Sequence, residues 1–267
     1  MNLKTFFFKF EKIKIMRKHS MFRSGNPALN SQVFKNLKRT SNGPLVRDDV
    51  MTIQGTVDKT GISLALLMFA GYFSYVPNGL LYMIIGGVGG FIVALITIFK
   101  KTWSPITVPL YAMFEGLLLG SISYVYGQML DGIVLNAIII TISILMSLLF
   151  VYKSGLIKVT ENFKLGVFAA TGGIALMYLF AFIGSFFGLS ISFLDPTNGS
   201  MMSIGISLVI IIIASLNLVL DFDFIEEGAE NGAPKYMEWY GAFGLLVTLV
   251  WLYLEILRLL LKLNSRK

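Results

Sequence analysis

The stretch SMMSIGISLVIIIIASLNLVLDFD, residues 200–223, decides the fold class, because it runs from Ser200 to Leu220 without a charge. A helix needs about 20 mostly apolar residues to cross the ~30 Å hydrocarbon core of a bilayer. Six further stretches have comparable length and few charges: 61–77, 80–99, 105–126, 132–152, 165–188 and 239–262. The sequence therefore predicts an all-α polytopic membrane bundle of about seven transmembrane helices.

The charge distribution predicts three regions: a basic polar tail over 1–60, the seven-helix domain over 61–262 and a short basic C-terminus over 263–267. Twelve of the 22 Lys and Arg residues lie in Met1–Lys59, against four acids. A basic flank of this kind is expected in the cytoplasm, attracted to anionic lipid. We therefore expect a multi-pass plasma-membrane protein with a cytoplasmic N-terminus and no nucleic-acid partner.

Two features of the chain ends stay open at this stage. Residues 1–20 are compatible with an amphipathic surface helix, or with translation that starts at Met21. Seven spans place the C-terminus outside, although it is basic and a basic end is expected inside. Either the last segment is re-entrant and returns inside, or the charges of the other loops determine the orientation. Seven full spans are favoured because the remaining loops agree. Lysines fall in the loops expected inside (Lys100, Lys101, Lys153, Lys158 and Lys164), and none falls in those near Val76, Gly127 and Ser190.

The residue inventory excludes most familiar catalytic centres. The chain has no cysteine and one histidine, His19. Disulfides, thiolate metal sites, histidine metal clusters and a Ser-His-Asp triad within one chain are therefore excluded. An aspartate-based intramembrane protease is disfavoured because its Gly-x-Gly-Asp context is absent. We expect a protein that is not an enzyme and that carries no cofactor and no resident metal.

Glycines within the predicted spans indicate close helix packing rather than a ligand loop. They form Gly86-Gly87-Val88-Gly89-Gly90 and the i, i+4 pairs Gly116/Gly120 and Gly184/Gly188. Small residues at this spacing let helix backbones approach closely in lipid. The glycines of 80–99 lack the strand-then-helix context of a phosphate cradle. No nucleotide site is predicted.

Ionisable groups inside the spans are the candidate functional residues, because each costs free energy in lipid and so tends to face protein or water. Glu115 lies near the middle of its span, and Asn217 and Asp221 share one face of theirs. Asp223 points away from that face; with Glu226 and Glu227 it could simply form a solvated acidic end. Glu255 is three residues before Arg258, so a purely structural ion pair is the competing interpretation.

Two segments then carry a family resemblance. Phe114-Glu115-Gly116-Leu117-x-Leu119-Gly120 resembles the Glu-Gly-Leu-x-Leu-Gly pattern in the third span of the Bax inhibitor family. Asp221-Phe-Asp-Phe-Ile225-x-Glu227-x-Ala229-Glu230-x-Gly232-x3-Tyr236 is similar to the end of its sixth span and the following loop. The Asn-Pro-Ala-Leu start at Asn26 and Tyr236-Met-Glu-Trp-Tyr240 resemble a bacterial branch.

The resemblance implies a bundle around a central last helix and a pH-sensitive leak of calcium, latched by two aspartates that share a proton. Two carboxylates in a low dielectric do not both ionise readily, so such a pair responds to pH. Asp221 takes the first position. An ungapped alignment with the family pattern places the second position of the pair at Leu246. The second position falls at Glu255 if this chain carries about nine more residues than the family pattern.

The expected function is thus a proton-gated cation leak. Its predicted sites are Asp221 and Glu255 as pH sensor and latch, with Glu115, Asn217 and Asp223 lining a pore or sensing protons. Transient cation binding is expected at Asp221 and Glu115, since carboxylates are the hard oxygen ligands that calcium prefers. The alternative is a non-conducting regulator that binds membrane proteins, such as a membrane protease, through its glycine-rich faces.

Overall fold

The computed structural model describes residues 50–189 and 191–266, and in these ranges the fold is all-helical, as predicted. A lone antiparallel bridge pairs Val50 with Pro234. The long helices are α3 (Ile53–Ser74), α4 (Leu80–Phe99), α5 (Ser104–Met129), α6 (Ile133–Lys153), α7 (Glu161–Ser185), α8 (Met201–Glu230) and α9 (Met237–Asn264); the short 3-10 helices are η2 (Lys101–Trp103) and η3 (Ser192–Leu194). The predictions about residues 1–49, including the choice between Met1 and Met21, lie outside the described residues.

Six of the seven long helices are long and apolar enough to cross a membrane: α4 to α9. Helix α3 falls short of that measure because its first turns are polar and include Asp58 and Lys59. It begins at Ile53 rather than at 61, with Thr52 as its cap: the Thr52 hydroxyl accepts a hydrogen bond of 2.9 Å from Gly55 N. Side-chain caps of this kind satisfy the unpaired N–H groups of a helix start.

Two predicted helix ends were wrong. Helix α7 stops at Ser185, not at 188, and Gly188 follows it with φ = +74°, a left-handed conformation that glycine adopts at no steric cost. The expected Gly184/Gly188 packing pair therefore does not exist. Helix α8 continues past 223 to Glu230, so the acids at 221–230 belong to the helix and not to a loop.

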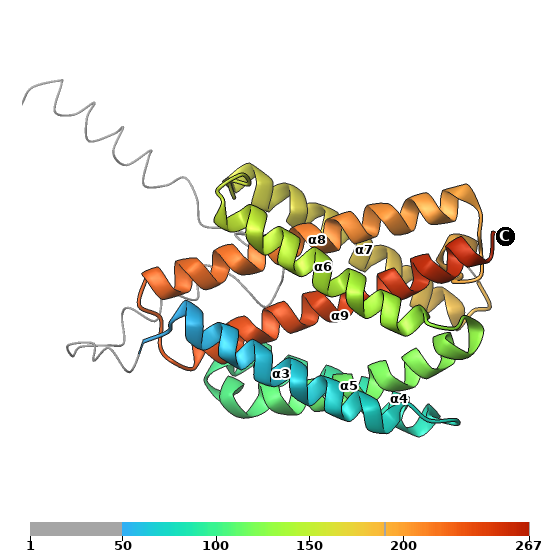
Figure 1. The fold of residues 1–267 in the computed structure, drawn as a ribbon, viewed down its shortest axis with the longest axis horizontal. Coiled ribbons are helices and arrows are strands. Elements are labelled where there is room, and N and C mark those ends of the chain that lie inside the picture. Colours follow the sequence, from blue (N-terminus) through green and yellow to red (C-terminus); the bar gives the residue numbers. More distant parts are fainter. Residues whose placement is uncertain (1–49, 190, 267) are drawn as a thin grey trace, which may run out of the picture.

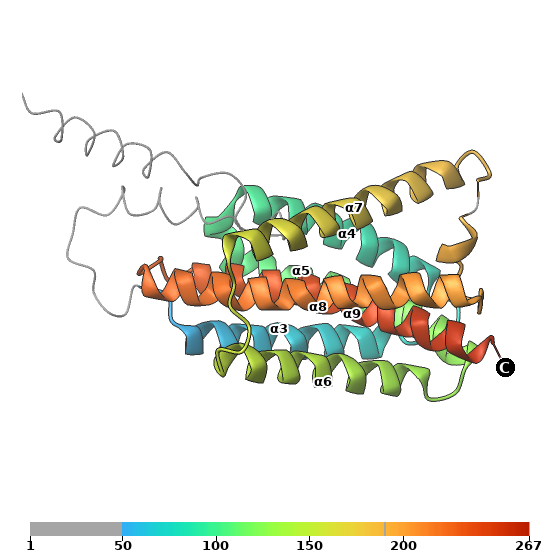
Figure 2. The ribbon, with the colours of Figure 1, turned by 90° about the horizontal axis from the view of Figure 1, so that it is seen from above.

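Helix α9 lies at the centre of the bundle, as predicted, and Figures 1 and 2 show the other helices around it. It packs against α3, α5, α6 and α8. Several of its large side chains, among them Tyr240, Phe243 and Leu252, are fully buried. We call the end where α3, α5, α7 and α9 begin the proximal end, and the opposite end distal.

Glycines let α3, α4 and α5 pack almost backbone to backbone. A Cβ built at Gly116 would lie 2.3 Å from the Leu67 carbonyl oxygen, and one at Gly120 would lie 2.1 Å from that of Gly71. A Cβ at Gly86 would lie 2.5 Å from Leu118 N. No side chain fits at these positions, which confirms the predicted intramolecular packing role of the glycines in α4 and α5.

Helix α7 is the exception to this close packing. Only Lys164 and Val167 of its 25 residues are buried. Figure 2 shows α7 diverging from α8 toward its distal end. Large apolar side chains such as Leu176, Phe180 and Phe182 face outward. The helix is thus held mainly by contacts other than apolar burial.

Candidate functional site

Asp221 is fully buried on α8, where it faces the central helix α9. The Thr248 hydroxyl of α9 donates a hydrogen bond of 2.6 Å to Asp221 Oδ2. The same hydroxyl lies 3.2 Å from the carbonyl oxygen of Gly244, one turn earlier on α9. A hydroxyl has one proton, so Thr248 has two acceptors in reach and can fully satisfy only one of them.

This geometry gives the pair two hydrogen-bond arrangements that differ by a proton. When Asp221 is ionised, the Thr248 hydroxyl donates to the carboxylate. When Asp221 is protonated, its own O–H can donate to Thr248 Oγ1, which then turns its proton to the Gly244 carbonyl. A proton gained or lost at Asp221 therefore changes what Thr248 bonds on the central helix.

Glu255 is also buried, but on α9 and among different partners. The Tyr178 hydroxyl of α7 donates to Glu255 Oε1, and Arg258 Nη1 donates to Oε1 at 2.9 Å and to Oε2 at 3.1 Å. Arg258 Nη1 also donates to the Tyr178 hydroxyl at 2.6 Å. The ion pair predicted between Glu255 and Arg258 is present in this cluster.

The structure does not bring Asp221 and Glu255 together. The residue of α9 that meets Asp221 is Thr248, seven positions before Glu255, or about 10.5 Å along the helix axis. Leu246, the other alignment partner, is fully buried close to Thr248. A hydroxyl thus stands where the family resemblance implied a second carboxylate.

Glu115 faces α4 rather than the Asp221 region. Its Oε1 lies 3.3 Å from the position that a Cβ on Gly90 would take. Tyr111, one turn earlier on α5, hydrogen-bonds the carboxylate side chain. Within the described part of the chain, Oε2 is buried and has no hydrogen-bond partner. A buried oxygen in that state is costly, so the site is a candidate for a proton or a transient ligand.

Asn217 and Asp223 both contact α7. Asn217 Nδ2 donates to Thr171 Oγ1 at 2.8 Å and to the Ile213 carbonyl at 2.9 Å. Asp223 Oδ2 lies 2.5 Å from Lys164 Nζ, and its side chain is 24% exposed. Glu226, next to it, accepts from the Tyr152 hydroxyl. The acidic end of α8 is therefore a bonded, half-buried cluster rather than the freely solvated end considered as an alternative.

Two further clusters escaped the sequence analysis. At the proximal end, buried Glu238 accepts from Thr52 N at 3.0 Å and from the Thr52 hydroxyl at 2.8 Å, and it pairs with Lys235 at 3.0 Å. At the distal end, buried Lys262 donates to the Phe193 carbonyl at 2.7 Å and to Ser207 Oγ at 2.9 Å. Glu238 and Lys262 are charges at the edges of a predicted span, and this was the signal that could have found the two clusters. The groups that bond Glu238 and Lys262 could not be predicted from the sequence.

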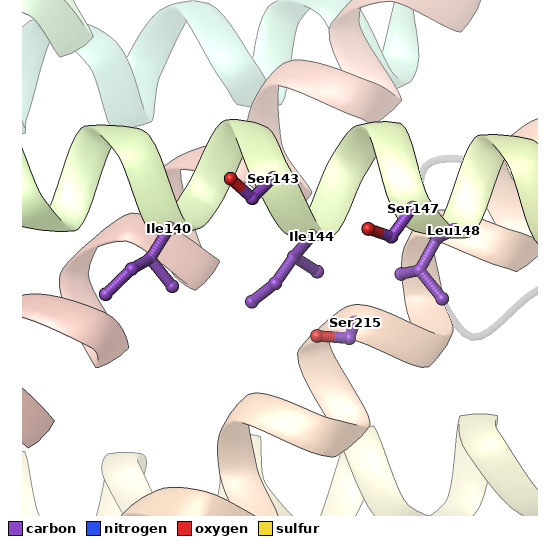
Figure 3. A pocket seen from close by; sticks show the side chains of 6 residues that line it. All are labelled: Ile140, Ser143, Ile144, Ser147, Leu148 and Ser215. Atoms are coloured by element: carbon purple, nitrogen blue, oxygen red, sulfur yellow. The ribbon is translucent and has the colours of Figure 1, made fainter.

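A pocket of about 390 Å³ lies between α6 and α8, on the face of the bundle, and Figure 3 shows its lining. The lining residues are Ile140, Ser143, Ile144, Ser147, Leu148 and Ser215. It lacks ionisable groups and is separate from Asp221. Within the described residues, no group of three or more His, Cys, Asp or Glu side chains is arranged to hold a metal ion.

The fold and site together define a polytopic helical membrane protein with buried carboxylates set against a central last helix. The family model described as Bax inhibitor 1 like matches residues 25–265, nearly the whole chain. The chain therefore belongs to the Bax inhibitor 1 like family. Searches among curated proteins and among solved structures gave no match.

Proposed function

We propose that this protein is a proton-sensitive cation leak, most simply for calcium, in which Asp221 senses the proton. The observation that carries the proposal is the Asp221–Thr248 contact, whose hydrogen bonding depends on whether Asp221 holds a proton. Membership of the Bax inhibitor 1 like family supports it as well. The proposal replaces the two-carboxylate latch with a carboxylate–hydroxyl pair between α8 and α9.

The distribution of charge along α9 is consistent with a closed conformation. Distal to Thr248, the half-buried guanidinium of Arg258 and the buried ammonium of Lys262 follow on the same helix. Cations in a low-dielectric interior repel a passing cation strongly. Passage past Asp221 toward the distal end would therefore require these groups to move or to stay paired, as Arg258 is with Glu255.

The test is calcium flux in liposomes that hold a calcium dye, measured from pH 5 to pH 8. Flux through the wild-type protein should change with pH, and Asp221→Asn should remove that dependence because the amide does not titrate. Thr248→Val should shift the pH at which flux changes, whereas Thr141→Val should not. Thr141 is the matched control because its hydroxyl bonds only the Ala137 carbonyl of its own helix. Flux that ignores pH, or that Asp221→Asn leaves unaltered, would overturn the proposal.

A second candidate is a non-conducting regulator of other membrane proteins. The glycine faces of α4 and α5 do not favour this function, because they pack against neighbouring helices of the same chain and are not free to bind a partner. The serine-lined pocket between α6 and α8 does favour it, since exposed hydroxyls on a lipid-facing surface suit a polar or small-residue partner helix. A stoichiometric partner recovered from native membranes, lost in Ser147→Leu, together with no flux in liposomes, would favour this function.

A further inference from the structure

Two lysines at the turn between α4 and α5 contact aromatic rings rather than carboxylates. Lys100 Nζ lies 5.8 Å from the centroid of the Trp103 ring, and Lys101 Nζ lies 5.4 Å from the centroid of the Tyr240 ring on α9. Among the residues that the structure describes, neither lysine is within ion-pair distance of an acid. A ring face attracts the charge of an ammonium but is not a conventional hydrogen-bond acceptor, so the N–H groups remain able to donate to an anion.

The side chains around this turn match the boundary between lipid headgroups and acyl chains. Phe99, Trp103 and Ile106 are 80%, 56% and 76% exposed, so the residues that flank the lysines present apolar surface outward. Exposed Leu110 and Met113 continue the face of Ile106 along α5, at positions i+4 and i+7. Tryptophan is enriched where membrane helices meet the headgroups, and lysines there extend their ammonium groups toward the phosphates. A ligand that fits both features has an anionic head and apolar chains.

The surroundings of the turn at the proximal end are also predominantly positive. Lys59 Nζ and Lys235 Nζ lie 3.5 Å and 3.0 Å from oxygens of Glu238, so two cations share one carboxylate at the start of α9. Lysines therefore outnumber acids among the described residues here, which are Lys59, Lys100, Lys101 and Lys235 against Asp58 and Glu238.

The opposite side of α9 has lysines as well, but they lie among acids. Tyr152, next to Lys153, donates to Glu226, and Lys164 pairs with Asp223 at 2.5 Å. Figure 1 shows α4 and α5 on one side of α9 and α6 and α7 on the other. An anionic group that approaches the proximal end is therefore repelled by the acids on the α6–α7 side and attracted to the α4–α5 turn.

We propose that Lys100, Lys101 and Trp103 form a binding site for the headgroup of an anionic phospholipid, whose acyl chains lie along the exposed face of α5. The lipid phosphate accepts charge-assisted hydrogen bonds from the two ammonium groups. The Trp103 ring lies at the level of the headgroup, with Ile106 beside the first part of the chains. The site is separate from the attraction of the basic tail to the membrane, and it does not depend on the proposed cation leak.

A lipid bound at this turn also supports the start of the central helix. Ser104 Oγ donates to the Tyr236 carbonyl at 2.8 Å, and Lys101 lies over the ring of Tyr240. The α4–α5 turn is thereby fastened to the start of α9, and an anion between its lysines holds the turn in that position.

The test uses Trp103 as a local reporter of the lipid in contact with it. Trp239→Phe and Trp251→Phe leave Trp103 as the single tryptophan of the full chain. The protein is placed in bilayers of phosphatidylglycerol or phosphatidylcholine with brominated acyl chains, which quench tryptophan fluorescence on contact. Mixtures of the two give the ratio of their association constants at Trp103. We expect a ratio of about five in favour of phosphatidylglycerol, and of about one in Lys100→Gln/Lys101→Gln.

The matched control is Lys153→Gln/Lys158→Gln, which removes two exposed lysines from the α6–α7 side and should keep the ratio of the parent. The basic tail is intact in both double variants, so its contribution is constant. A ratio near one in the parent, or an equal fall in the two double variants, would overturn the site.

Two further measurements separate the remaining outcomes. Inorganic phosphate in the buffer should leave the ratio unchanged, whereas competition by phosphate would overturn the lipid as the ligand. If Trp239→Phe/Trp251→Phe does not fold, native mass spectrometry of the otherwise unaltered chain counts the phosphatidylglycerol molecules retained. Lys100→Gln/Lys101→Gln should then retain fewer than Lys153→Gln/Lys158→Gln, and equal retention would overturn the site.

Discussion

Thr248 and Tyr178 are the residues that turn isolated carboxylates into sites, and neither stands out in the sequence. Asp221, Glu115 and the Glu255–Arg258 pair could be predicted because charges are rare and costly inside apolar spans. Hydroxyl groups are common in such spans and carry no comparable penalty. Which of them meets a carboxylate depends on the rotation and tilt of a second helix, which a single sequence does not specify.

Lys262 gives a prediction at the scale of one residue. Its buried ammonium is held by the Phe193 carbonyl, Ser207 Oγ and, at 3.4 Å, the Ser203 carbonyl. Lys262→Met keeps most of the side-chain volume but leaves these oxygens without their donor, which costs about 1–3 kcal/mol for a buried polar group. We expect that loss in the free energy of unfolding, measured by denaturant titration in mixed micelles.

Lys153→Met is the control for this prediction, because Lys153 is exposed at the end of α6. It should leave the unfolding free energy within about 0.5 kcal/mol of the wild type, as surface substitutions usually do. An equal effect of the two substitutions on the unfolding free energy would show that the hydrogen bonds from the Lys262 ammonium to the surrounding oxygens do not stabilise the fold.

At the scale of the element, the apolar runs predicted most helices well and failed where polar residues extend or end a helix. Helix α4 begins and ends at the predicted residues, 80 and 99. The start of α3 was missed because Thr52 caps polar turns that resemble a tail. The end of α7 was missed because Gly184 and Gly188 fit a packing pair and a helix stop equally well.

Glycine substitutions distinguish a packed helix from a loosely held one. Gly120→Ala would place a Cβ 2.1 Å from the Gly71 carbonyl oxygen, so α3 and α5 must separate. Overpacking of this kind costs about 1–3 kcal/mol, and the contact with backbone places it at the upper end. We expect a lower thermal unfolding midpoint in detergent.

Gly173→Ala on α7 is the paired substitution, since its Cβ would meet nothing within 4 Å. Alanine is favoured over glycine in a helix interior by about 0.5–1 kcal/mol, so the midpoint should stay level or rise. A similar fall for both variants would contradict the difference in packing between α5 and α7.

At the scale of the whole molecule, the family, the all-helical class and the central last helix could all be predicted, whereas the pairing of sites between helices could not. The resemblance placed α9 at the centre, and the structure confirms it. It also implied a carboxylate pair between the last two helices. Thr248 occupies the position opposite Asp221, about two turns before Glu255 on α9.

The orientation of the bundle is a prediction that two single-cysteine variants can test. Lysine-rich connections are expected in the cytoplasm. Lys158→Cys, between α6 and α7, should react with a membrane-impermeant maleimide only after the cells are permeabilised. Asp131→Cys, between α5 and α6, should react in intact cells; both residues are exposed. The opposite labelling pattern would invert the predicted topology.

The Glu238 cluster has a mechanical consequence for the basic segment that precedes Val50. Met51 N donates to the Ala233 carbonyl, and the Thr52 cap bonds Glu238 in the first turn of α9. A Cβ on Gly55 would lie 2.0 Å from Glu238 Oε1, so the carboxylate is wedged against the start of α3. A pulling force on the segment before Val50 is therefore transmitted first through these contacts to the start of α9. The central helix of the bundle then carries the force before the rest of α3 does.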